Sequence, residues 1–354
     1  MKTVLVAVLD WGLGHATRSI PVVRELIKQN ARVLIAGDGS SLSLLKQEFP
    51  DLKFYELPAY AIRYPQAGSM VWTIAKQFAH LQKVIQHEFK VVAEIVDDEN
   101  VDAIISDNRY GCFAPSIPSI LICHQLNLQL PSGWRWMKFV VDALHNHYLK
   151  RFTEIWIPDM PDAGLSFSGA LSQTNFSNTK RIGILSRFED GAAPKESLYD
   201  IVALISGPEP QRSIFETVIR KELLKFNGKA LMVNGQPHGQ ARTTGAVIEV
   251  NHLKASELDS VLRNTKVIVA RSGYSTIMDL AALGQRAILI STPGQTEQEY
   301  LAKHLTERGW IVTQNQNDFD LMEMLDAVKK INTMPHVKPN TFLPHAITDL
   351  LCRC

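Results

Sequence analysis

The chain has 354 residues, of which 45% are hydrophobic and 21% are charged. This composition is typical of a soluble globular protein, and the length suits two α/β domains better than a single core. The formal net charge of +1 argues against nucleic acid as a partner. The four cysteines form no CxxC pair, and no apolar stretch reaches the roughly 20 residues of a membrane span, so we expect a cytoplasmic protein with free thiols.

Short apolar runs alternate with helical stretches along the first half of the chain. Helical segments separate several of the runs, which indicates right-handed βαβ units and a parallel sheet. A small, polar segment at 161–179 follows, and we place a linker near 186–198. The apolar runs, which are rich in β-branched residues, are 4–9, 32–37, 102–106, 119–123 and 154–158.

A second alternation follows the linker, with strands expected at 201–206, 229–233, 246–250, 266–270 and 286–291 and helices at 256–263, 275–283 and 297–308. We therefore predict an α/β fold of two Rossmann-like domains, 1–186 and 187–339, that face each other across a cleft. A last helix at 340–354 is placed to pack back on the first domain. Ligands bind outside the carboxyl ends of such strands, so the two domains are expected to share one site.

The first candidate motif is GLGHATR, which follows the first apolar run directly. Gly12 and Gly14 would let a ligand approach the backbone, and the start of the next helix favours negative charge. Thr17 stands where a dinucleotide fingerprint has its third glycine, which argues against an NAD-dependent dehydrogenase. His15 is expected in the first helical turn, where the helix dipole disfavours the imidazolium and keeps the ring available as a base. The alternative is a turn with an incidental histidine.

A second candidate lies at 270–291, where Ser272 and Gly273 open a helix whose N–H groups can hold a phosphate. Asp279, about two turns into that helix, would reach a ribose diol. The next loop brings Gln295, Gln298 and Glu299 to another helix start, and such groups suit sugar hydroxyls. The alternatives are an ordinary βαβ unit with an N-capping serine and a solvated first helical turn.

Together these motifs resemble the GT-B glycosyltransferases, in particular the family of the N-acetylglucosaminyltransferase that forms lipid II. The resemblance covers the two-domain layout of nearly the whole chain, whereas specific motifs cover a small part of it. It implies a hexosyltransferase that moves an N-acetylhexosamine-like sugar from a UDP-sugar, bound mainly by the second domain, to an acceptor hydroxyl. It also implies no metal and no other cofactor. A role in cell-envelope polysaccharide synthesis follows from the same resemblance.

The resemblance also implies roles for individual residues. His15 would be the catalytic base, and the other implied roles are donor phosphate binding by Gly12, Gly14, Arg187, Ser272 and Gly273; nucleoside binding by His252, Leu253 and Asp279; donor sugar binding by Gln295, Gln298 and Glu299; and an acceptor side formed by Arg18, His124 and Asn127. Glu299 departs from the family, which has glutamine there, so the identity of the sugar stays open.

A further departure concerns the loop at 206–211, where the family has a glycine-rich phosphate loop. Pro208 and Pro210 lack N–H donors, and Glu209 would repel a phosphate if its carboxylate pointed inward. Donor phosphates would therefore depend more on Arg187, Ser272 and Gly273. Asp318 and Asp320 have the Asp-x-Asp spacing of metal-binding transferases. Acidic residues at a helix start are also what the helix dipole favours, so we expect no metal site there.

The segment 131–152 is predicted to form a helix with Trp134, Met137, Val141, Leu144 and Tyr148 on one stripe, flanked by basic residues. Such a helix can rest on an anionic bilayer at the inner face of the membrane or contact a lipid-linked acceptor, although most such stripes face a core. Two other functions stay open: a nucleotide-sugar hydrolase that uses water as the nucleophile, and a non-catalytic nucleotide-sugar binder.

Overall fold

The computed structural model describes residues 1–60, 70–191, 197–235, 242–244 and 247–354. The chain divides into two compact units. Among the described residues, unit 1 comprises 1–60, 70–187 and 340–354, and unit 2 comprises those between 188 and 339. The linker expected near 186–198 falls at the change of unit, and its residues 192–196 lie outside the described residues.

Unit 1 contains a parallel sheet of seven strands in the order β3-β2-β1-β4-β5-β6-β7. Every pairing in this sheet is parallel. The strands are β1 (Thr3–Val8), β2 (Arg32–Gly37), β3 (Lys53–Glu56), β4 (Ala103–Asp107), β5 (Ser119–Ile122), β6 (Glu154–Ile157) and β7 (Thr179–Arg181). β1 is buried along its whole length, as its continuous apolar sequence predicts.

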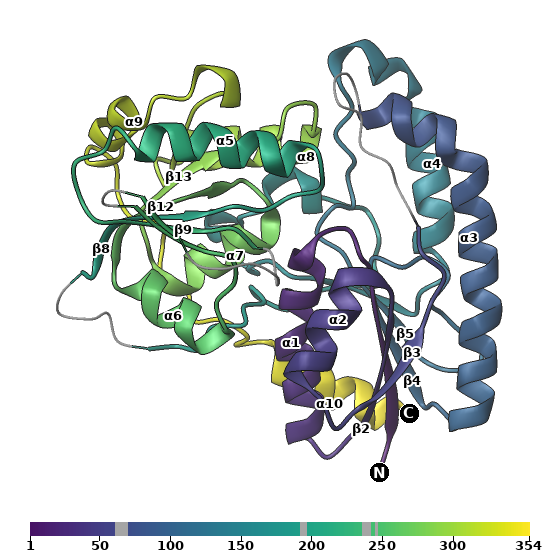
Figure 1. Cartoon of the computed structure of the whole chain (residues 1–354). Helices are drawn as coiled ribbons and strands as arrows, with labels where there is room; N and C mark the ends of the chain where they lie inside the picture. The colour runs from purple at the N-terminus through teal and green to yellow at the C-terminus, as the bar shows by residue number, and fades with distance from the viewer. Residues whose placement is uncertain (61–69, 192–196, 236–241, 245–246) are drawn as a thin grey trace. The chain divides into compact units, whose positions relative to one another are not determined.

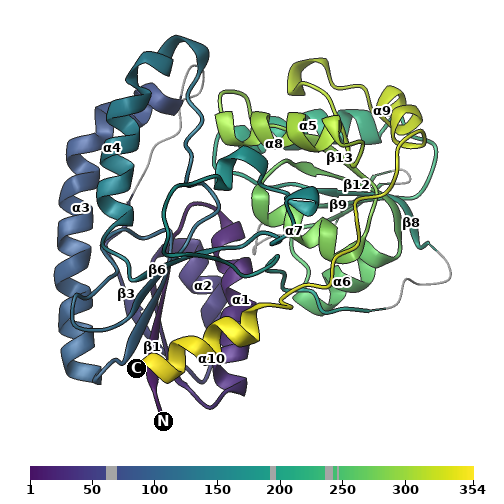
Figure 2. The same cartoon turned by 180° about the vertical axis from the view of Figure 1, so that it is seen from behind.

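Helices cover both faces of this sheet (Figure 1). α3 packs on one face, where Val92 and Ile95 join Leu5 and Leu34 in a buried cluster. α1 and α2 cover the other face, and α10 lies alongside α1 (Figure 2), where the Gln29 side chain donates to the Pro344 carbonyl at 3.0 Å. The helices are α1 (Leu13–Lys28), α2 (Gly39–Glu48), α3 (Met70–Glu99), α4 (Lys138–Leu149) and α10 (Leu343–Arg353), and the short 3-10 helix η1 (Ser132–Met137) precedes α4.

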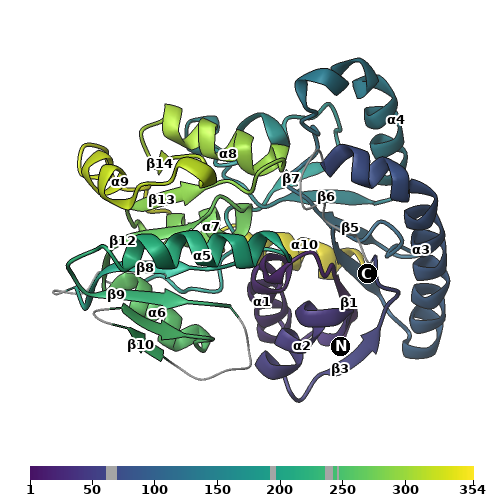
Figure 3. The ribbon, with the colours of Figure 1, turned by 45° about the horizontal axis from the view of Figure 1, so that its top comes forward.

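Unit 2 repeats this architecture with a sheet in the order β10-β11-β9-β8-β12-β13-β14 (Figure 3). Only the β10–β11 pairing is antiparallel among the described strands. The strands are β8 (Tyr199–Leu204), β9 (Ala230–Val233), β10 (Arg242–Thr244), β11 (Val247–Val250), β12 (Thr265–Arg271), β13 (Ala287–Ile290) and β14 (Val312–Thr313); the helices are α5 (Gln211–Leu223), α6 (Ala255–Arg263), α7 (Tyr274–Leu283), α8 (Thr296–Glu307) and α9 (Leu321–Val328), with the 3-10 helix η4 (Gln316–Asp318). α5 lies on one face of the sheet and α6 and α7 lie on the other (Figure 1).

The two sheets share one doubly wound topology, so the predicted pair of Rossmann-like domains is confirmed. In each sheet the strand order reverses between two neighbours, which are β1 and β4 in unit 1 and β8 and β12 in unit 2. Open α/β sheets bind their ligands at the carboxyl ends of the strands at this switch point. The loops after these four strands are therefore where functional side chains are expected. No helix in the described part of the chain is long and apolar enough to cross a membrane.

Candidate active site

Gly12 turns the chain from β1 into α1. It adopts φ 89°, a left-handed conformation that glycine tolerates best, and it is the N-cap residue of α1. The turn places His15 in the first turn of the helix, with 13% of its side chain exposed. Thr17, which replaces the third glycine of a dinucleotide fingerprint, donates its hydroxyl hydrogen to the Gly14 carbonyl at 3.0 Å. Its role there is within the helix.

Asp107 ends β4, the strand next to β1, and its carboxylate contacts both His15 and Arg18. One oxygen, Oδ1, lies 3.1 Å from His15 Nδ1, and the other accepts from Arg18 Nε at 2.8 Å. A second guanidinium nitrogen, Arg18 Nη2, donates to Oδ1. The Arg18 and Asp107 side chains are 2% and 1% exposed. A buried ion pair with two hydrogen bonds therefore lies beside the imidazole.

Two neighbours bear on the position of the proton on His15. Asp107 Oδ1, 3.1 Å from Nδ1, accepts from a protonated Nδ1, whereas Arg18 Nη2, 2.9 Å from Nδ1, donates to an unprotonated one. In the tautomer that the Asp107 contact favours, the N–H is on Nδ1 and the lone pair of the neutral ring is on Nε2. This arrangement is the one a general base needs, because a second group fixes the tautomer and the orientation of the imidazole.

Burial and the positive charge of Arg18 favour the neutral form of His15. Burial, with the Arg18 guanidinium adding to it, lowers the pKa of His15 below its ordinary value, and Asp107 opposes this only in part. Burial alone would raise the pKa of Asp107, but Arg18 and His15 outweigh it and hold that pKa well below its usual range. The sequence assigned the neutral ring to the helix dipole, and the structure adds burial and the Arg18 guanidinium as causes.

The three residues expected on the acceptor side have different surroundings. His124 is 4% exposed, and its Nδ1 lies 3.4 Å from Arg18 Nη1, which places it in the His15 cluster. Arg18 donates to Asp107, and its Nη2 also lies 2.9 Å from His15 Nδ1. Asn127 is held by neighbours, because its Nδ2 donates to Ala170 O at 3.0 Å and its Oδ1 accepts from Lys138 Nζ at 2.9 Å.

In unit 2 the structure brings the helix start at Ser272 and Gly273 into contact with the helix start that carries Gln298. Gly273 is the N-cap residue of α7 and makes no side-chain cap, so the first N–H groups of the helix have no side-chain acceptor from it. The buried Ser272 donates its hydroxyl hydrogen to the Gln298 carbonyl at 2.9 Å. Asp279 lies in the second turn of α7 and is 9% exposed. The start of α7 and the segment with the predicted sugar-binding residues at the start of α8 are therefore neighbours.

The loop before α8 is shaped by its own side chains. Gln298 Oε1 accepts from the Thr292 N–H at 2.8 Å, which leaves its NH₂ group as the donor. Glu299 Oε1 accepts from the Gly294 N–H at 3.0 Å, and Gln295 is the N-cap residue of α8. The departure from glutamine at 299 thus keeps an acceptor for the loop backbone.

The atypical loop after β8 is capped by its own carboxylate. Glu209 accepts from the Ser213 N–H at 3.3 Å and lies 3.4 Å from Arg212 Nη1. It therefore occupies an N–H group at the start of α5 that a phosphate would otherwise use.

Three more predicted site residues lie after β11 and at the end of unit 1. His252 is exposed and Leu253 is half-buried in the turn between β11 and α6. Arg187 is half-buried at the end of unit 1, where its carbonyl accepts from Arg24 Nη1 at 3.5 Å. The predicted nucleobase residues thus lie in unit 2 with Ser272 and Gly273, whereas Arg187 belongs to unit 1.

The Asp-x-Asp pair has the structural role expected of it. Asp320 caps α9 by accepting from the Glu323 N–H at 3.0 Å. Within the described ranges no group of three His, Cys, Asp or Glu residues is arranged to hold a metal ion.

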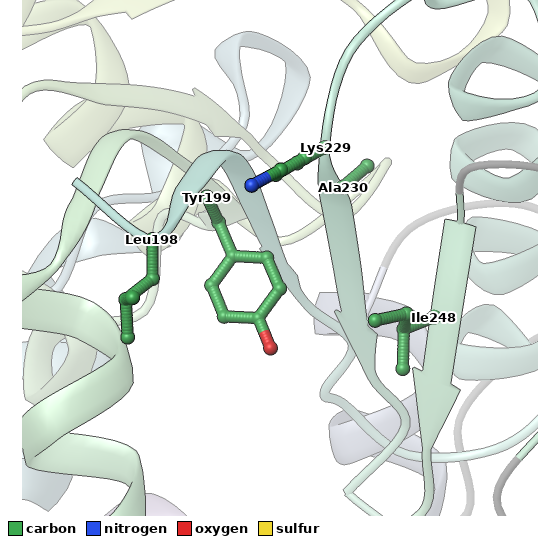
Figure 4. A pocket seen from close by; sticks show the side chains of 5 residues that line it. All are labelled: Leu198, Tyr199, Lys229, Ala230 and Ile248. Atoms are coloured by element: carbon green, nitrogen blue, oxygen red, sulfur yellow. The ribbon is translucent and has the colours of Figure 1, made fainter.

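Unit 2 also contains a cavity of about 330 Å³ lined by Leu198, Tyr199, Lys229, Ala230 and Ile248 (Figure 4). Tyr199 and Ala230 are the first residues of β8 and β9. The cavity therefore lies at the amino ends of these strands, whereas Ser272 and Gly273 follow the carboxyl end of β12. It is separate from the candidate site.

The segment 131–152 exposes a different apolar face from the one predicted. Trp134, Met137, Val141 and Tyr148 are half-buried. Trp136 and Phe139 are instead 79% and 84% exposed, and Val140 and Leu144 are also exposed. The cause is that 132–137 forms a 3-10 helix before α4 begins, which changes the helical phase across the segment.

Sequence reasoning missed Asp107 as a functional residue. Its signal was present, because it directly follows the predicted strand 102–106. The carboxyl ends of neighbouring parallel strands meet at one edge, so a carboxylate after this strand could be expected near His15.

Comparisons with known proteins agree with this architecture. Residues 233–342 match the glycosyltransferase family 28 C-terminal domain. An uncharacterised glycosyltransferase of Methanosarcina acetivorans is 23% identical over 327 residues, covering 87% of this chain and 84% of the relative. A UDP-N-acetylglucosamine–N-acetylmuramyl-(pentapeptide) pyrophosphoryl-undecaprenol N-acetylglucosamine transferase of Natranaerobius thermophilus is 21% identical, covering 90% and 88%. The crystal structure of Acinetobacter baumannii MurG superposes with a TM-score of 0.59 at 12% identity over 100% of both chains.

Two doubly wound units of this kind define the GT-B fold. The chain is a glycosyltransferase of this class, and it resembles the N-acetylglucosaminyltransferase that forms lipid II.

Proposed function

We propose that this glycosyltransferase transfers an N-acetylhexosamine-like sugar from a UDP-sugar to an acceptor hydroxyl without a metal ion. The matched family domain contains Ser272, Gly273 and Asp279, the residues proposed for the donor. The name of the Natranaerobius relative, which uses a UDP-linked N-acetylhexosamine, supports the choice of donor.

The observation that carries the proposal is the contact between His15 and Asp107. With Nδ1 held by the carboxylate, Nε2 takes the proton of the acceptor hydroxyl as its oxygen attacks the anomeric carbon. A bond forms between that oxygen and the anomeric carbon, and the bond from the anomeric carbon to the diphosphate oxygen breaks. UDP leaves with the electron pair, and the proton stays on His15 until solvent removes it.

Charge on the leaving diphosphate is stabilised by oriented N–H groups in this proposal. The start of α7 at Gly273 supplies such groups, and the dipole of the helix favours an anion there. Arg187 is proposed as a further cation for the diphosphate, and Gln298 as a donor to sugar hydroxyls. Activity that persists in EDTA would support transfer without a metal. The shared cleft between the domains stays a prediction of the sequence.

A lipid-linked acceptor at the inner face of the membrane fits two observations. The Natranaerobius relative is named for an undecaprenol-linked acceptor. Trp136 and Phe139 are strongly exposed in unit 1 and lie beside Lys138. Exposed aromatic side chains with a basic neighbour suit an anionic bilayer surface.

The hydrolase and the non-catalytic binder are not favoured, because the relatives with long coverage reported above are named as glycosyltransferases. Incubation with UDP-sugars, with and without lipid-linked and soluble acceptors, separates the three functions. Transfer gives UDP release that depends on the acceptor. Hydrolysis releases UDP and free sugar without an acceptor, and a binder gives no turnover with any pair.

A further inference from the structure

Arg271 is a buried cation at the carboxyl end of β12. It is 2% exposed, and burial lowers its pKa to about 9. Its guanidinium donates to the carbonyls of Ser291 at 2.9 Å and Gln211 at 3.2 Å, and also to Gln316 Oε1. All three acceptors are neutral. Within the described residues no carboxylate pairs with Arg271, and its Nε has no hydrogen-bond partner.

Other buried arginines of this chain are paired with acids. Arg109 contacts Glu88 and Asp38, and Arg18 contacts Asp107. An ionised group removed from water without an opposite charge costs several kcal/mol, even where neutral dipoles surround it. The Phe215 ring, whose centroid lies 3.9 Å from the guanidinium carbon of Arg271, adds a cation–π contact but no negative charge. Packing alone therefore does not account for this cation, which no described carboxylate neutralises.

The position of Arg271 connects this charge with the donor. β12 and β8 are the neighbours between which the strand order of unit 2 reverses. Arg271 precedes Ser272 and Gly273 at the start of α7, and its bond to Gln211 places the guanidinium at the first turn of α5. Both helices direct their positive ends toward this edge of the sheet. Glu209 caps the start of α5, so the buried cation and the start of α7 are the main sources of positive potential at this edge.

Further polar groups without partners lie at the same edge. Asn234 follows β9 and Thr292 follows β13, and they are 6% and 1% exposed. Asn234 Oδ1 and Thr292 Oγ1 have no hydrogen-bond partner within the described residues. Buried polar atoms are normally satisfied, so two such atoms after β9 and β13, the strands that flank β8 and β12, point to a polar ligand.

We propose that Arg271 is a positioning residue whose buried charge is neutralised by the diphosphate of the nucleotide donor. The inference rests on the proposed function, because it takes a nucleoside diphosphate as the ligand of unit 2. Arg271 takes the place of the N–H donors that Pro208 and Pro210 remove from the loop after β8. It does so through its electric field, since its side chain is buried.

The test measures the binding of UDP and of uridine to the wild type, Arg271→Met and Arg271→Lys by calorimetry. A unit charge acting over about 8–10 Å at an effective dielectric of about 20 changes affinity about 10–30-fold. We expect Arg271→Met to raise the Kd of UDP by this factor and the Kd of uridine by less than about 2-fold. Arg271→Lys, which keeps the charge, should fall in between and also guards against a methionine variant that does not fold.

Ligand-free melting temperatures separate this role from a structural one. Arg271→Met removes an uncompensated charge but also leaves three acceptors unpaired, so its ligand-free melting temperature should fall less than that of a variant that breaks a buried ion pair, whereas the rise in melting temperature with UDP shrinks. The matched control is Arg220→Met, because Arg220 on α5 is paired with Glu249 at 2.9 Å. That variant should melt lower and keep the wild-type ratio of UDP to uridine affinity.

Equal losses of UDP and uridine affinity in Arg271→Met, or unchanged UDP affinity, would overturn the role of Arg271 and leave the proposed function standing. A wild-type enzyme that binds neither UDP nor dTDP would overturn both.

Discussion

Asp107 Oδ1 lies 3.1 Å from Nδ1 of His15, and the two residues follow neighbouring strands at the switch point of the unit 1 sheet. The contact joins two parts of the chain that are 92 residues apart. It favours the tautomer with the N–H on Nδ1, and the ion pair with Arg18 fixes the carboxylate. The first prediction concerns this contact.

Asp107→Asn should lower kcat about 10²–10⁴-fold, the usual contribution of general base catalysis. The amide is close in shape to the carboxylate, but its NH₂ group can donate to Nδ1 and move the ring proton to Nε2. The Kd for UDP should not change, because the donor is proposed to bind unit 2. Steady-state kinetics and calorimetry on one preparation measure both. A variant that loses UDP affinity in parallel with kcat would contradict a role in base catalysis.

The acid limb of the pH profile should lie below the ordinary histidine pKa of about 6.5. The base must be neutral, and burial with Arg18 lowers the pKa of His15, so kcat should stay on its plateau at pH 6.5 and fall only at lower pH. Arg18→Gln leaves the negative Asp107 beside His15 and should move the limb to higher pH. Among the described residues, the titratable groups that act on His15 are Arg18, Asp107 and His124. A limb that stays in place in Arg18→Gln would exclude the electrostatic role of Arg18.

Gly273→Ala should weaken UDP binding about tenfold with little change in stability. An added Cβ would meet no heavy atom within 4 Å, and φ is −74°, which alanine adopts readily. The free energy of unfolding should therefore stay within about 0.5 kcal/mol of the wild type. The methyl group would project at the helix start where the phosphate is proposed to bind. Thermal shifts with UDP measure this, with Gly133→Ala, which is equally unobstructed in unit 1, as the control. If Gly273→Ala bound UDP with wild-type affinity, the start of α7 would not be the phosphate site.

Replacing Trp136 and Phe139 together by alanine should reduce co-sedimentation with anionic vesicles. These side chains are the most exposed aromatic residues among those described in η1 and α4, so their loss removes apolar area that can enter a bilayer. Turnover of a soluble acceptor should not change. The control pair, Leu224→Ala with Met322→Ala, removes side chains of unit 2 that are 53% and 52% exposed. Equal vesicle binding by both double variants would contradict a membrane surface at η1 and α4.

Arg109→Met should destabilise the enzyme by about 3–5 kcal/mol, because it leaves Glu88 buried without its partner. Both side chains of this ion pair are 0% exposed. Chemical denaturation measures the loss, and Glu88→Gln in the same chain should restore part of it. This loss should exceed the one in Arg271→Met, although both arginines are buried. Similar losses in the two variants would mean that burial alone, and not the pairing of charge, decides their stability.

The sequence predicted the two parallel sheets well, because buried strands such as 4–9 and 266–270 are continuous apolar runs between helical segments. It did not predict β3, β7, β10 or β14, which are short and lie at or near the sheet edges, where burial leaves a weaker pattern. The start of η1 also gave no signal, so the exposed aromatic face at Trp136 and Phe139 was assigned to other residues.

For the site, the motif GLGHATR placed His15 correctly at a helix start, since glycine spacing after a strand is a local signal. The residues that set its chemistry could not be found from local patterns alone. Asp107 reaches His15 only because β4 pairs with β1, and Arg271 differs from any other buried arginine only by the acids it lacks. Both properties depend on contacts between distant segments. The roles of the predicted site residues stay predictions until they are measured.

The central claim is that Asp107 holds His15 as a neutral imidazole with its lone pair on Nε2. Nitrogen-15 NMR of the ring, assigned by the loss of its signals in His15→Ala, tests it directly. At pH 7 the account predicts a protonated Nδ1 and an unprotonated Nε2, and in Asp107→Asn the proton moves. A proton on Nε2 in the wild type, or a fully charged ring at pH 7, would contradict it.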